Sequence, residues 1–308
     1  MTTTETAAGA APEWRAAGTD LSERRRSGVS RGAIADLAAT PEMLAVSWNA
    51  DGRARIGASV TIEAIGSDEA LAAAYPGLVA AANGLATPQI RHLATLGGNL
   101  AQRSRCWYYR NPEIACLKKG GADCPAREGN HRYGVAFDLG PCVAPHPSSM
   151  ASALMAYEAT VVTDRRNGPS IAALLGDGSD GTSDHALEPG EIITAIDLPL
   201  PVAGERAVYK RAISRTWAEW PLVEVVARVV VEDGVIRHVR LTAGGVAPVP
   251  LRLTEAEQAA QGASASPDTI LKAAQAASAG ARPLPMTGYK VTLLEGLVRD
   301  VLERCLDA

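Results

Sequence analysis

The sequence predicts an α+β fold, and two features of its second half carry that prediction. Residues 222–232 and 235–244 alternate apolar and polar side chains around Asp233-Gly234, a dipeptide typical of the tight turn in a β-hairpin. Helical patterns follow, and one of them begins at Ser266-Pro267 and ends at Gly280. Strands followed by helices indicate an antiparallel sheet that helices cover.

Two further helices complete this half. TEAE at residues 254–257 fits a capping box for a helix that closes at Gly262. The last helix begins near Lys290 and places its apolar residues on one face. Cys305 belongs to that apolar face, so we assign it to the core, where a free cysteine behaves as a small hydrophobe.

The length of 308 residues allows two domains with a large core. A strand at 192–201 ends in prolines, and we place the domain boundary just after it. The prediction is therefore a disordered lead-in over residues 1–14, a first domain over 15–202 and a second domain over 203–308.

The composition excludes several classes of protein. The net charge is −4, from 30 basic and 34 acidic side chains, so the overall charge does not indicate a nucleic-acid-binding protein. No run approaches the ~18 apolar residues of a membrane span, and the start of the chain lacks the features of a secretory signal. We therefore expect a cytoplasmic protein without membrane or nucleic-acid partners.

The first half mixes strands and helices. Residues 53–59 indicate a strand, residues 75–85 a buried, alanine-lined helix, and residues 159–163 a strand that follows a helix. The segment TLGGN, residues 95–99, is predicted to break regular structure. Its two glycines can adopt positive φ and let the backbone approach a ligand closely, but for an isolated Gly-Gly a plain turn between helices is the favoured interpretation.

Four of the five cysteines lie in a segment spanning residues 103–142, with the spacing Cys-x9-Cys-x7-Cys-x17-Cys. Structural zinc sites use cysteine pairs separated by two to four residues, and this segment contains none. Iron–sulfur ligands can be spaced more widely. Residues 103–132 also hold seven basic side chains against three acidic ones, which favours an anionic cluster. An iron–sulfur cluster is the leading interpretation, while zinc, a disulfide and unliganded thiols remain open. The ligands would be Cys106, Cys116, Cys124 and Cys142.

Several motifs, taken in order, resemble one family. RAAGTDL (15–21) and ATPQIRHLATLGGNLAQ (86–102) resemble the two flavin loops of the FAD-binding medium subunit of molybdenum hydroxylases, the xanthine dehydrogenase and carbon monoxide dehydrogenase group. HPSSMASALMAYEATV (146–161), YKRAISR (209–215) and LTAGGVAPVPLR (241–252) continue the likeness. The resemblance implies a PCMH-type FAD-binding domain followed by a C-terminal domain of the CO dehydrogenase flavoprotein type.

The cysteine segment is similar to one subgroup of that family. RCWYYRNPEIACLKKGGADC (105–124) resembles the insertion of 4-hydroxybenzoyl-CoA reductase and a bacterial aldehyde oxidoreductase, where four cysteines hold an additional 4Fe–4S cluster. The resemblance thus implies FAD and a 4Fe–4S cluster in this chain. It also implies a large molybdenum-cofactor subunit and a small subunit with 2Fe–2S clusters as partners.

The resemblance also assigns residues to the FAD site. The first loop would contact the adenine and pyrophosphate through Ala17, Gly18, Thr19 and Asp20. The second loop would hold the ribityl and pyrophosphate through Thr95, Gly97, Gly98 and Asn99, with the glycine amides donating to phosphate oxygens. Ser149 occupies a flavin-side position, and Lys210 would lie near the isoalloxazine ring or, equally, be a solvated strand lysine.

Three departures from the family pattern bear on FAD. The family has a further strand–helix unit before the first loop, whereas only about fourteen residues precede it here. Ala17 replaces a glycine, and Ser149 replaces an acidic residue. No pair or triad of histidines suggests substrate chemistry, so the chain is expected to move electrons between partner clusters, FAD and an external acceptor. The alternatives are a cluster-only relay without FAD and a zinc-stabilised binding module; periplasmic location would require export with a partner.

Overall fold

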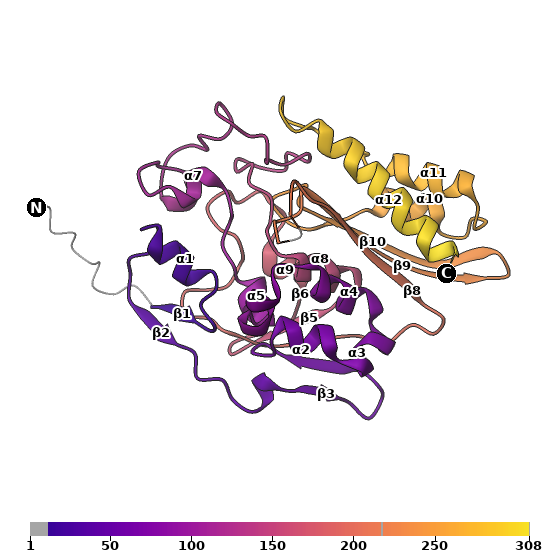
Figure 1. The fold of residues 1–308 in the computed structure, drawn as a ribbon, viewed down its shortest axis with the longest axis horizontal. Coiled ribbons are helices and arrows are strands. Elements are labelled where there is room, and N and C mark those ends of the chain that lie inside the picture. Colours follow the sequence, from indigo (N-terminus) through magenta and orange to yellow (C-terminus); the bar gives the residue numbers. More distant parts are fainter. Residues whose placement is uncertain (1–11, 217, 308) are drawn as a thin grey trace, which may run out of the picture.

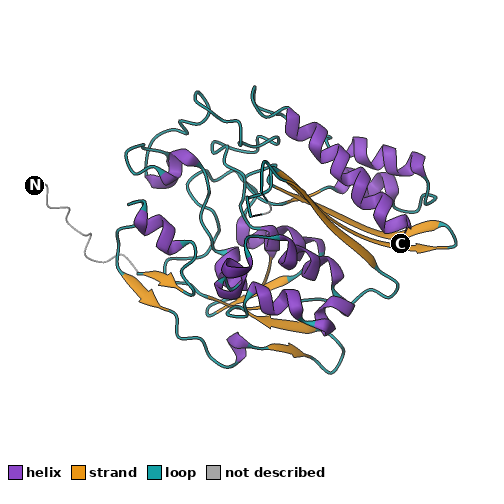
Figure 2. Ribbon diagram, in the orientation of Figure 1, coloured by secondary structure: helices purple, strands orange, loops and turns teal. Residues whose placement is uncertain are grey.

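The computed structural model describes residues 12–216 and 218–307, and it contains two antiparallel sheets with helices around them (Figures 1 and 2). The first sheet has the strand order β3-β4-β7-β5-β6, and the second has the order β11-β10-β9-β8. A two-stranded parallel pair, β1 (Glu13–Arg15) with β2 (Ile34–Asp36), lies at the N-terminal end. The α+β prediction is confirmed.

The five-stranded sheet is built almost entirely from short strands, paired antiparallel throughout. Its strands are β3 (Val46–Trp48), β4 (Ala54–Gly57), β5 (Thr160–Thr163), β6 (Asn167–Ser170) and β7 (Ile193–Asp197).

Short helices pack around this sheet, and most start at a Ser, Thr or Asp that caps the first turn. Thr61, Thr87 and Thr95, for example, each accept a hydrogen bond from a backbone N–H three residues later. The helices are α1 (Leu21–Arg26), α2 (Ile62–Ser67), α3 (Glu69–Ala74), α4 (Pro76–Gly84), α5 (Pro88–Leu93), α6 (Leu96–Leu100), α7 (Trp107–Arg110), α8 (Ser149–Ala156) and α9 (Ile171–Leu175), with 3-10 turns at Glu42–Leu44 and Leu117–Lys119.

The second sheet is a long hairpin with two flanking strands. Its strands are β8 (Arg206–Ala212), β9 (Val223–Glu232), β10 (Val235–Gly244) and β11 (Leu251–Arg252). The hairpin turn has positive φ at both Asp233 and Gly234, as a type I′ turn requires. One face packs against α10 (Thr254–Ala260), α11 (Pro267–Ala276) and α12 (Tyr289–Asp307), visible as the helical layer beside the strands in Figure 1.

Helix α8 joins the two parts of the molecule. It is almost wholly buried, and its backbone accepts hydrogen bonds from the second sheet. The Thr242 hydroxyl donates to the carbonyl of Ser152 at 2.8 Å, and the Arg228 guanidinium donates to the carbonyl of Ala156 at 2.7 Å. Helix α8, which precedes the strands of the second sheet in the chain, is therefore in direct contact with that sheet.

Several local predictions are corrected by the structure. The segment TLGGN does not break regular structure, because Thr95 caps α6, and neither Gly97 nor Gly98 has positive φ. Residues 13–14 of the expected lead-in belong to β1, while residues 1–11 lie outside the described part. The predicted capping box at Thr254 is absent. Leu253 occupies the N-cap position of α10, and its side chain makes no capping hydrogen bond. By contrast, Cys305 is fully buried in the apolar face of α12, as predicted.

Within residues 12–216 and 218–307, none of the helices combines the length and apolarity needed to cross a bilayer.

Candidate functional site

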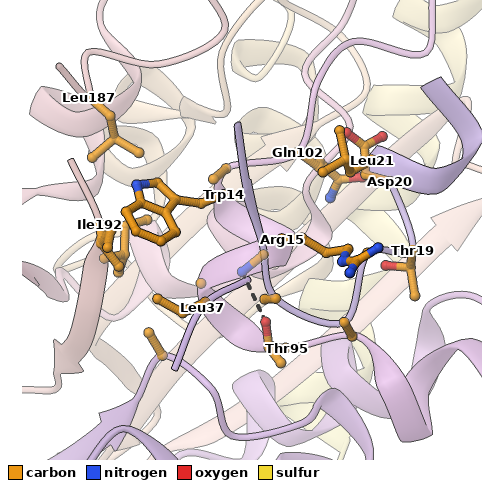
Figure 3. Close-up of a pocket in the computed structure, with 18 of the residues that line it drawn as sticks. Trp14, Arg15, Thr19, Asp20, Leu21, Leu37, Thr95, Gln102, Leu187 and Ile192 are labelled. Carbon is orange, nitrogen blue, oxygen red and sulfur yellow. Dashed lines mark hydrogen bonds between the residues drawn. The ribbon is translucent and has the colours of Figure 1, made fainter. Parts of the chain in front are cut away.

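The first predicted loop lines a cleft beside the β1–β2 pair (Figure 3). Gly18 has a φ of +75°, which turns the chain between β1 and α1. The backbone N–H groups of Ala17, Gly18, Thr19 and Asp20 donate to no acceptor among the described residues. Successive free amides at such a turn form an anion-binding concavity, which fits the pyrophosphate of FAD.

An apolar pocket closes one end of this cleft. Figure 3 shows Trp14 beside Leu187 and Ile192, and the Trp14 indole N–H donates to the carbonyl of Gly190 at 3.0 Å. A flat ring flanked by aliphatic side chains suits an adenine base. Sequence reasoning missed this wall, because Trp14 was placed in the lead-in and Leu187 lies within residues 176–191, whose Gly, Ser and Asp indicate a loop.

The second loop forms the floor of the cleft but is built differently from the prediction. A Cβ on Gly97 would lie 2.9 Å from the Ala58 Cβ, so only glycine lets α6 pack this closely. The amide of Gly97 donates to the Ala58 carbonyl at 2.8 Å, and the amide of Gly98 donates to the Thr95 hydroxyl at 3.2 Å. The expected glycine donors are thus already used, and the free amides lie on the first loop instead.

The cleft continues toward the second sheet, past Thr19, Gly98 and Gln102, which line both of its ends. This second end, of about 1070 Å³, is lined by Asn99 and Ser149. The Asn99 side chain accepts a hydrogen bond from the Ser148 hydroxyl at 2.6 Å.

Arg211, rather than Lys210, faces this end of the cleft. Adjacent residues of a strand point to opposite faces, so β8 directs Lys210 away from it. The Nε and Nη2 atoms of Arg211 are buried and have no hydrogen-bond partner among the described residues. A buried cation with unused donors fits an acceptor such as the flavin ring.

Glu224 is a second residue that the sequence did not single out. Its carboxyl is buried beneath Ser149 and accepts hydrogen bonds from the hydroxyls of Tyr209 at 2.7 Å and Ser152 at 3.1 Å. Burial raises the pKa of Glu224 above its ordinary value, although these hydroxyls and nearby Arg211 oppose the shift. Ser149 itself carries no charge, but a carboxyl does lie next to it.

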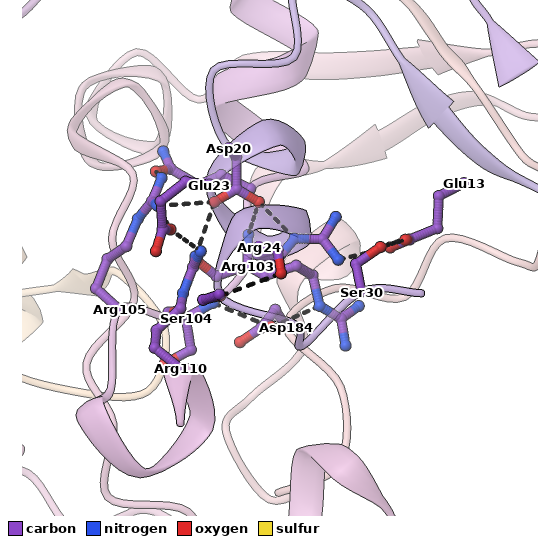
Figure 4. Close-up of polar contacts among 12 residues, drawn as sticks. Glu13, Asp20, Glu23, Arg24, Ser30, Arg103, Ser104, Arg105, Arg110 and Asp184 are labelled. Atoms are coloured by element: carbon purple, nitrogen blue, oxygen red, sulfur yellow. Dashed lines mark hydrogen bonds and ion pairs between the residues drawn. The ribbon is translucent and has the colours of Figure 1, made fainter. Parts of the chain in front are cut away.

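Asp20 binds arginines rather than facing a ligand alone (Figure 4). Its carboxylate accepts from Arg24 at 3.0 Å and Arg110 at 2.7 Å, and lies 2.8 Å from Arg105. Burial would raise the pKa of Asp20, but these three guanidinium groups lower it below its ordinary value. Two of the arginines belong to the cysteine segment, so Asp20 anchors that segment to α1.

The four cysteines of the segment line one small cavity. Cys116 and Cys142 are buried, Cys106 and Cys124 are partly buried, and none forms a disulfide. Interaction with the Cys142 thiol lowers the pKa of Cys124 to about 5, while burial raises the pKa of Cys106. Lys118 also borders the cavity and supplies positive charge. We call this cavity the cysteine cage.

The cage does not have the geometry of a single-ion site. Among the described residues, no three His, Cys, Asp or Glu side chains are close enough to hold one metal ion. Four thiols around one cavity are instead suited to a multi-iron cluster, whose ligands surround a larger group. The zinc interpretation therefore gains no support, and the 4Fe–4S cluster stays a prediction that this finding does not confirm.

The cage adjoins the cleft. Arg105 lines the second end of the cleft, and the next residue, Cys106, lines the cage. Consecutive Cα atoms are ~3.8 Å apart, so the two sites are separated by little more than one residue at this point.

Comparison with known families matches both halves of the chain. Residues 9–201 match the FAD-binding domain of molybdopterin dehydrogenases, and residues 207–305 match the C-terminal domain of the CO dehydrogenase flavoprotein.

Relatives and solved structures agree with these matches. The FAD-binding subunit PaoB of an aldehyde oxidoreductase from Escherichia coli K12 is 34% identical over 82% of this chain and 78% of its own length. The xanthine dehydrogenase FAD-binding subunit of Escherichia coli O157:H7 is 24% identical over 77% of this chain and 67% of its own length. In fold, the chain is similar to carbon monoxide dehydrogenase from Hydrogenophaga pseudoflava (TM-score 0.74, 21% identity, 96% and 90% coverage) and quinoline 2-oxidoreductase from Pseudomonas putida 86 (TM-score 0.73, 18% identity, 96% and 89% coverage).

With both domains matched in order and a 34% identical relative covering most of the chain, the protein belongs to the FAD-binding subunits of the molybdenum hydroxylase family, the oxidoreductases that include CO dehydrogenase and xanthine dehydrogenase.

Proposed function

We propose that this chain is the flavin and iron–sulfur electron-transfer subunit of a three-subunit molybdenum hydroxylase or dehydrogenase. The observation that carries the proposal is the cysteine cage, in which four thiols line one cavity directly beside the cleft. When bound, FAD and a 4Fe–4S cluster would supply electron transfer between the partner subunits and an external acceptor.

The cleft supports a definite assignment of roles for FAD. The free amides of residues 17–20 would bind the pyrophosphate, and Trp14 would flank the adenine. Arg211 would place positive charge beside the isoalloxazine ring, where a cation favours the reduced, anionic flavin. Thr95, Gly97, Gly98 and Asn99 would shape the floor rather than donate to phosphate.

The cage would hold the 4Fe–4S cluster through Cys106, Cys116, Cys124 and Cys142. Lys118 on the cage wall would offset part of the negative charge that four thiolates give a cluster. Nearby positive charge raises a cluster's reduction potential, which favours accepting electrons.

The same proposal includes the partners and the compartment. A large subunit with the molybdenum cofactor would transform the substrate, and a small subunit with 2Fe–2S clusters would pass electrons to this chain. The relative PaoB is the FAD-binding subunit of an aldehyde oxidoreductase, which makes aldehydes the first substrates to assay. We place the complex in the cytoplasm, and in the periplasm only when a partner carries it there. The domains assigned are 15–202 and 203–308.

The test is the content of iron, acid-labile sulfide and flavin per chain, measured on this chain after the complex has been purified anaerobically and its subunits have been separated. About four iron atoms and about one FAD per chain are expected. Cys116→Ala should lose the iron and keep the flavin, whereas Cys305→Ala, at a buried cysteine outside the cage, should keep both.

The other outcomes discriminate between functions. Iron without flavin would support a cluster-only relay, for which the internally bonded amides of Gly97 and Gly98 are the structural argument. Zinc without sulfide would contradict the proposal and favour a zinc-stabilised module.

A further inference from the structure

A third cavity, of about 1160 Å³, lies between the cysteine segment and the second sheet. Four aromatic side chains contribute to its walls: Trp107, Tyr108, Tyr133 and Trp220. We call it the aromatic pocket. The proposed cofactors have places in the cleft and the cage, so this pocket has no occupant in the function described above.

The aromatic pocket adjoins both candidate redox sites. It shares Cys106 and Tyr108 with the cysteine cage, and it shares Arg105 and Trp220 with the second end of the cleft. The Arg105 guanidinium lies over the Trp220 ring, 4.7 Å from its centroid, and this pair separates the pocket from the cleft. A molecule in the pocket would therefore contact the walls of both sites.

The walls are suited to a flat aromatic molecule. Trp107 and Tyr133 pack edge to face with centroids 5.2 Å apart, and they remain 55% and 40% exposed. Exposed aromatic surface that faces a cavity offers stacking worth about 0.5–1.5 kcal/mol per pair beyond the area buried. A dinucleotide would need free backbone amides to bind its pyrophosphate. The one glycine among the described lining residues, Gly134, already donates its amide to the His131 carbonyl at 2.7 Å, so a dinucleotide is disfavoured.

Lys290 provides a polar anchor in the same pocket. It is 1% exposed, and its ammonium donates to the carbonyls of Gly245 at 2.7 Å and Tyr133 at 3.3 Å. An ammonium has three donors, so one is unused, and no carboxylate of the described residues forms an ion pair with it. Burial lowers the pKa of Lys290 to about 7. A buried cation without an anion is costly, and an oxygen acceptor on a ligand would relieve that cost.

We propose that the aromatic pocket binds a planar electron acceptor of the quinone class, stacked on Trp107 and Tyr133 with one oxygen facing Lys290. The proposal rests on the electron-transfer function above and names its external acceptor. The quinone takes up two electrons, delivered by the complex's own redox groups, and two protons from solvent, and leaves as the hydroquinone.

The test uses 1,4-naphthoquinone-2-sulfonate as probe and the purified complex with its cofactors. Binding is measured by equilibrium dialysis on the oxidised complex, which needs no turnover. Trp107→Ala and Lys290→Met should each weaken binding at least tenfold. Trp48→Leu is the matched control, because Trp48 is 40% exposed on the other sheet and outside the pocket, and it should leave binding unchanged.

Two results would overturn the inference. One is binding that Trp107→Ala leaves intact while the iron and flavin contents are normal. The other is probe that binds only to complex lacking FAD and not to complex with its full flavin content, which would put it in the cleft. Trp107 is exposed, so its variant tests the site even if Lys290→Met fails to fold. Flavin and iron are determined on the same samples, so loss of the proposed function is seen separately from loss of probe binding.

Discussion

Gly97 acts through close contact rather than through an unusual backbone angle. It lies inside α6 with ordinary helical geometry, yet its Cα faces Ala58 at a distance that no side chain tolerates. The close approach brings the second loop onto β4 and sets the floor of the cleft. At the scale of single residues, the shape of the cleft therefore depends on the missing side chain of Gly97 as much as on any hydrogen-bond donor that lines it.

Gly97→Ala should destabilise the protein by about 1–3 kcal/mol, because the added Cβ overpacks against Ala58, and it should reduce bound flavin. Urea unfolding and flavin content measure the two effects. Gly296→Ala is the control. Gly296 lies on the exposed side of α12, and a Cβ there meets nothing within 4 Å, so this variant should stabilise the protein by about 0.5–1 kcal/mol. Equal effects at the two positions would contradict this account.

Glu224 should make stability fall as pH rises. Its pKa is raised in the folded state, chiefly by burial, so near the ordinary value of 4.5 the folded protein keeps the proton that the unfolded chain loses. Stability is greatest below that value and is lost as pH rises through the folded pKa, by at most ~1.4 kcal/mol per pH unit.

Glu224→Gln should remove this part of the pH dependence. Urea unfolding of both proteins from pH 4.5 to 7.5 should show a shallower decline for the variant. Parallel curves would mean that the carboxyl is not held protonated in the folded protein.

At the scale of elements, α1 and the cysteine segment depend on each other. The sequence LSERRR forms this short helix, and Asp20, Glu23 and Glu13 pair with arginines around it. Arg105 and Arg110 come from a segment about eighty to ninety residues away. Two of the basic residues that favoured an anionic cluster, Arg105 and Arg110, are thus contacts that attach the insertion to the first loop.

Asp20→Asn should cost about 3 kcal/mol, because it removes the carboxylate that three partly buried arginines share and leaves them only Glu13 and Glu23. The lowered pKa of Asp20 gives the same direction: its stabilisation is present above the ordinary value of 3.8 and is lost as pH falls. Unfolding and iron content would both report the change. Asp36→Asn, at an exposed pair with Arg15, should change neither, and a similar loss there would contradict the role of Asp20.

At the scale of the whole molecule, the cysteine segment is the part with least structure of its own. Between α6 and α8 the described chain has only α7 and one 3-10 turn, and its small apolar cluster consists of Ala126, Val135 and Val143 with three neighbours. The two sheets, by contrast, each have a large core. A bound cluster would therefore contribute much of the order in this segment.

Removing iron with a chelator should increase tryptic cleavage after Lys118, Lys119 and Arg127 by about tenfold or more, while the hairpin of β9 and β10 stays intact. Mass spectrometry of timed digests measures both regions in one sample. Cleavage at the same rate with and without iron would show that the segment is ordered by its ion pairs alone.

The sequence by itself determined the features that depend on residues within a few positions of one another. The Asp233-Gly234 turn, the capped start of α11 and the apolar face that contains Cys305 were predictable, because caps, turns and periodic faces are local. The family motifs marked the two loops that line the cleft but not the direction of each side chain, so the sequence could not show that Arg211, rather than Lys210, faces the cleft.

Only the tertiary structure decided which groups meet. It brought four cysteines with gaps of up to seventeen residues around one cavity and placed Glu224 beneath Ser149. It also gave the amides of Gly97 and Gly98 hydrogen-bond acceptors within the protein, whereas the amides of residues 17–20 have no acceptor among the described residues. The physical reason is that burial, ion pairing and hydrogen-bond satisfaction depend on neighbours in space, and here such neighbours can lie as far as 176 residues apart in the chain.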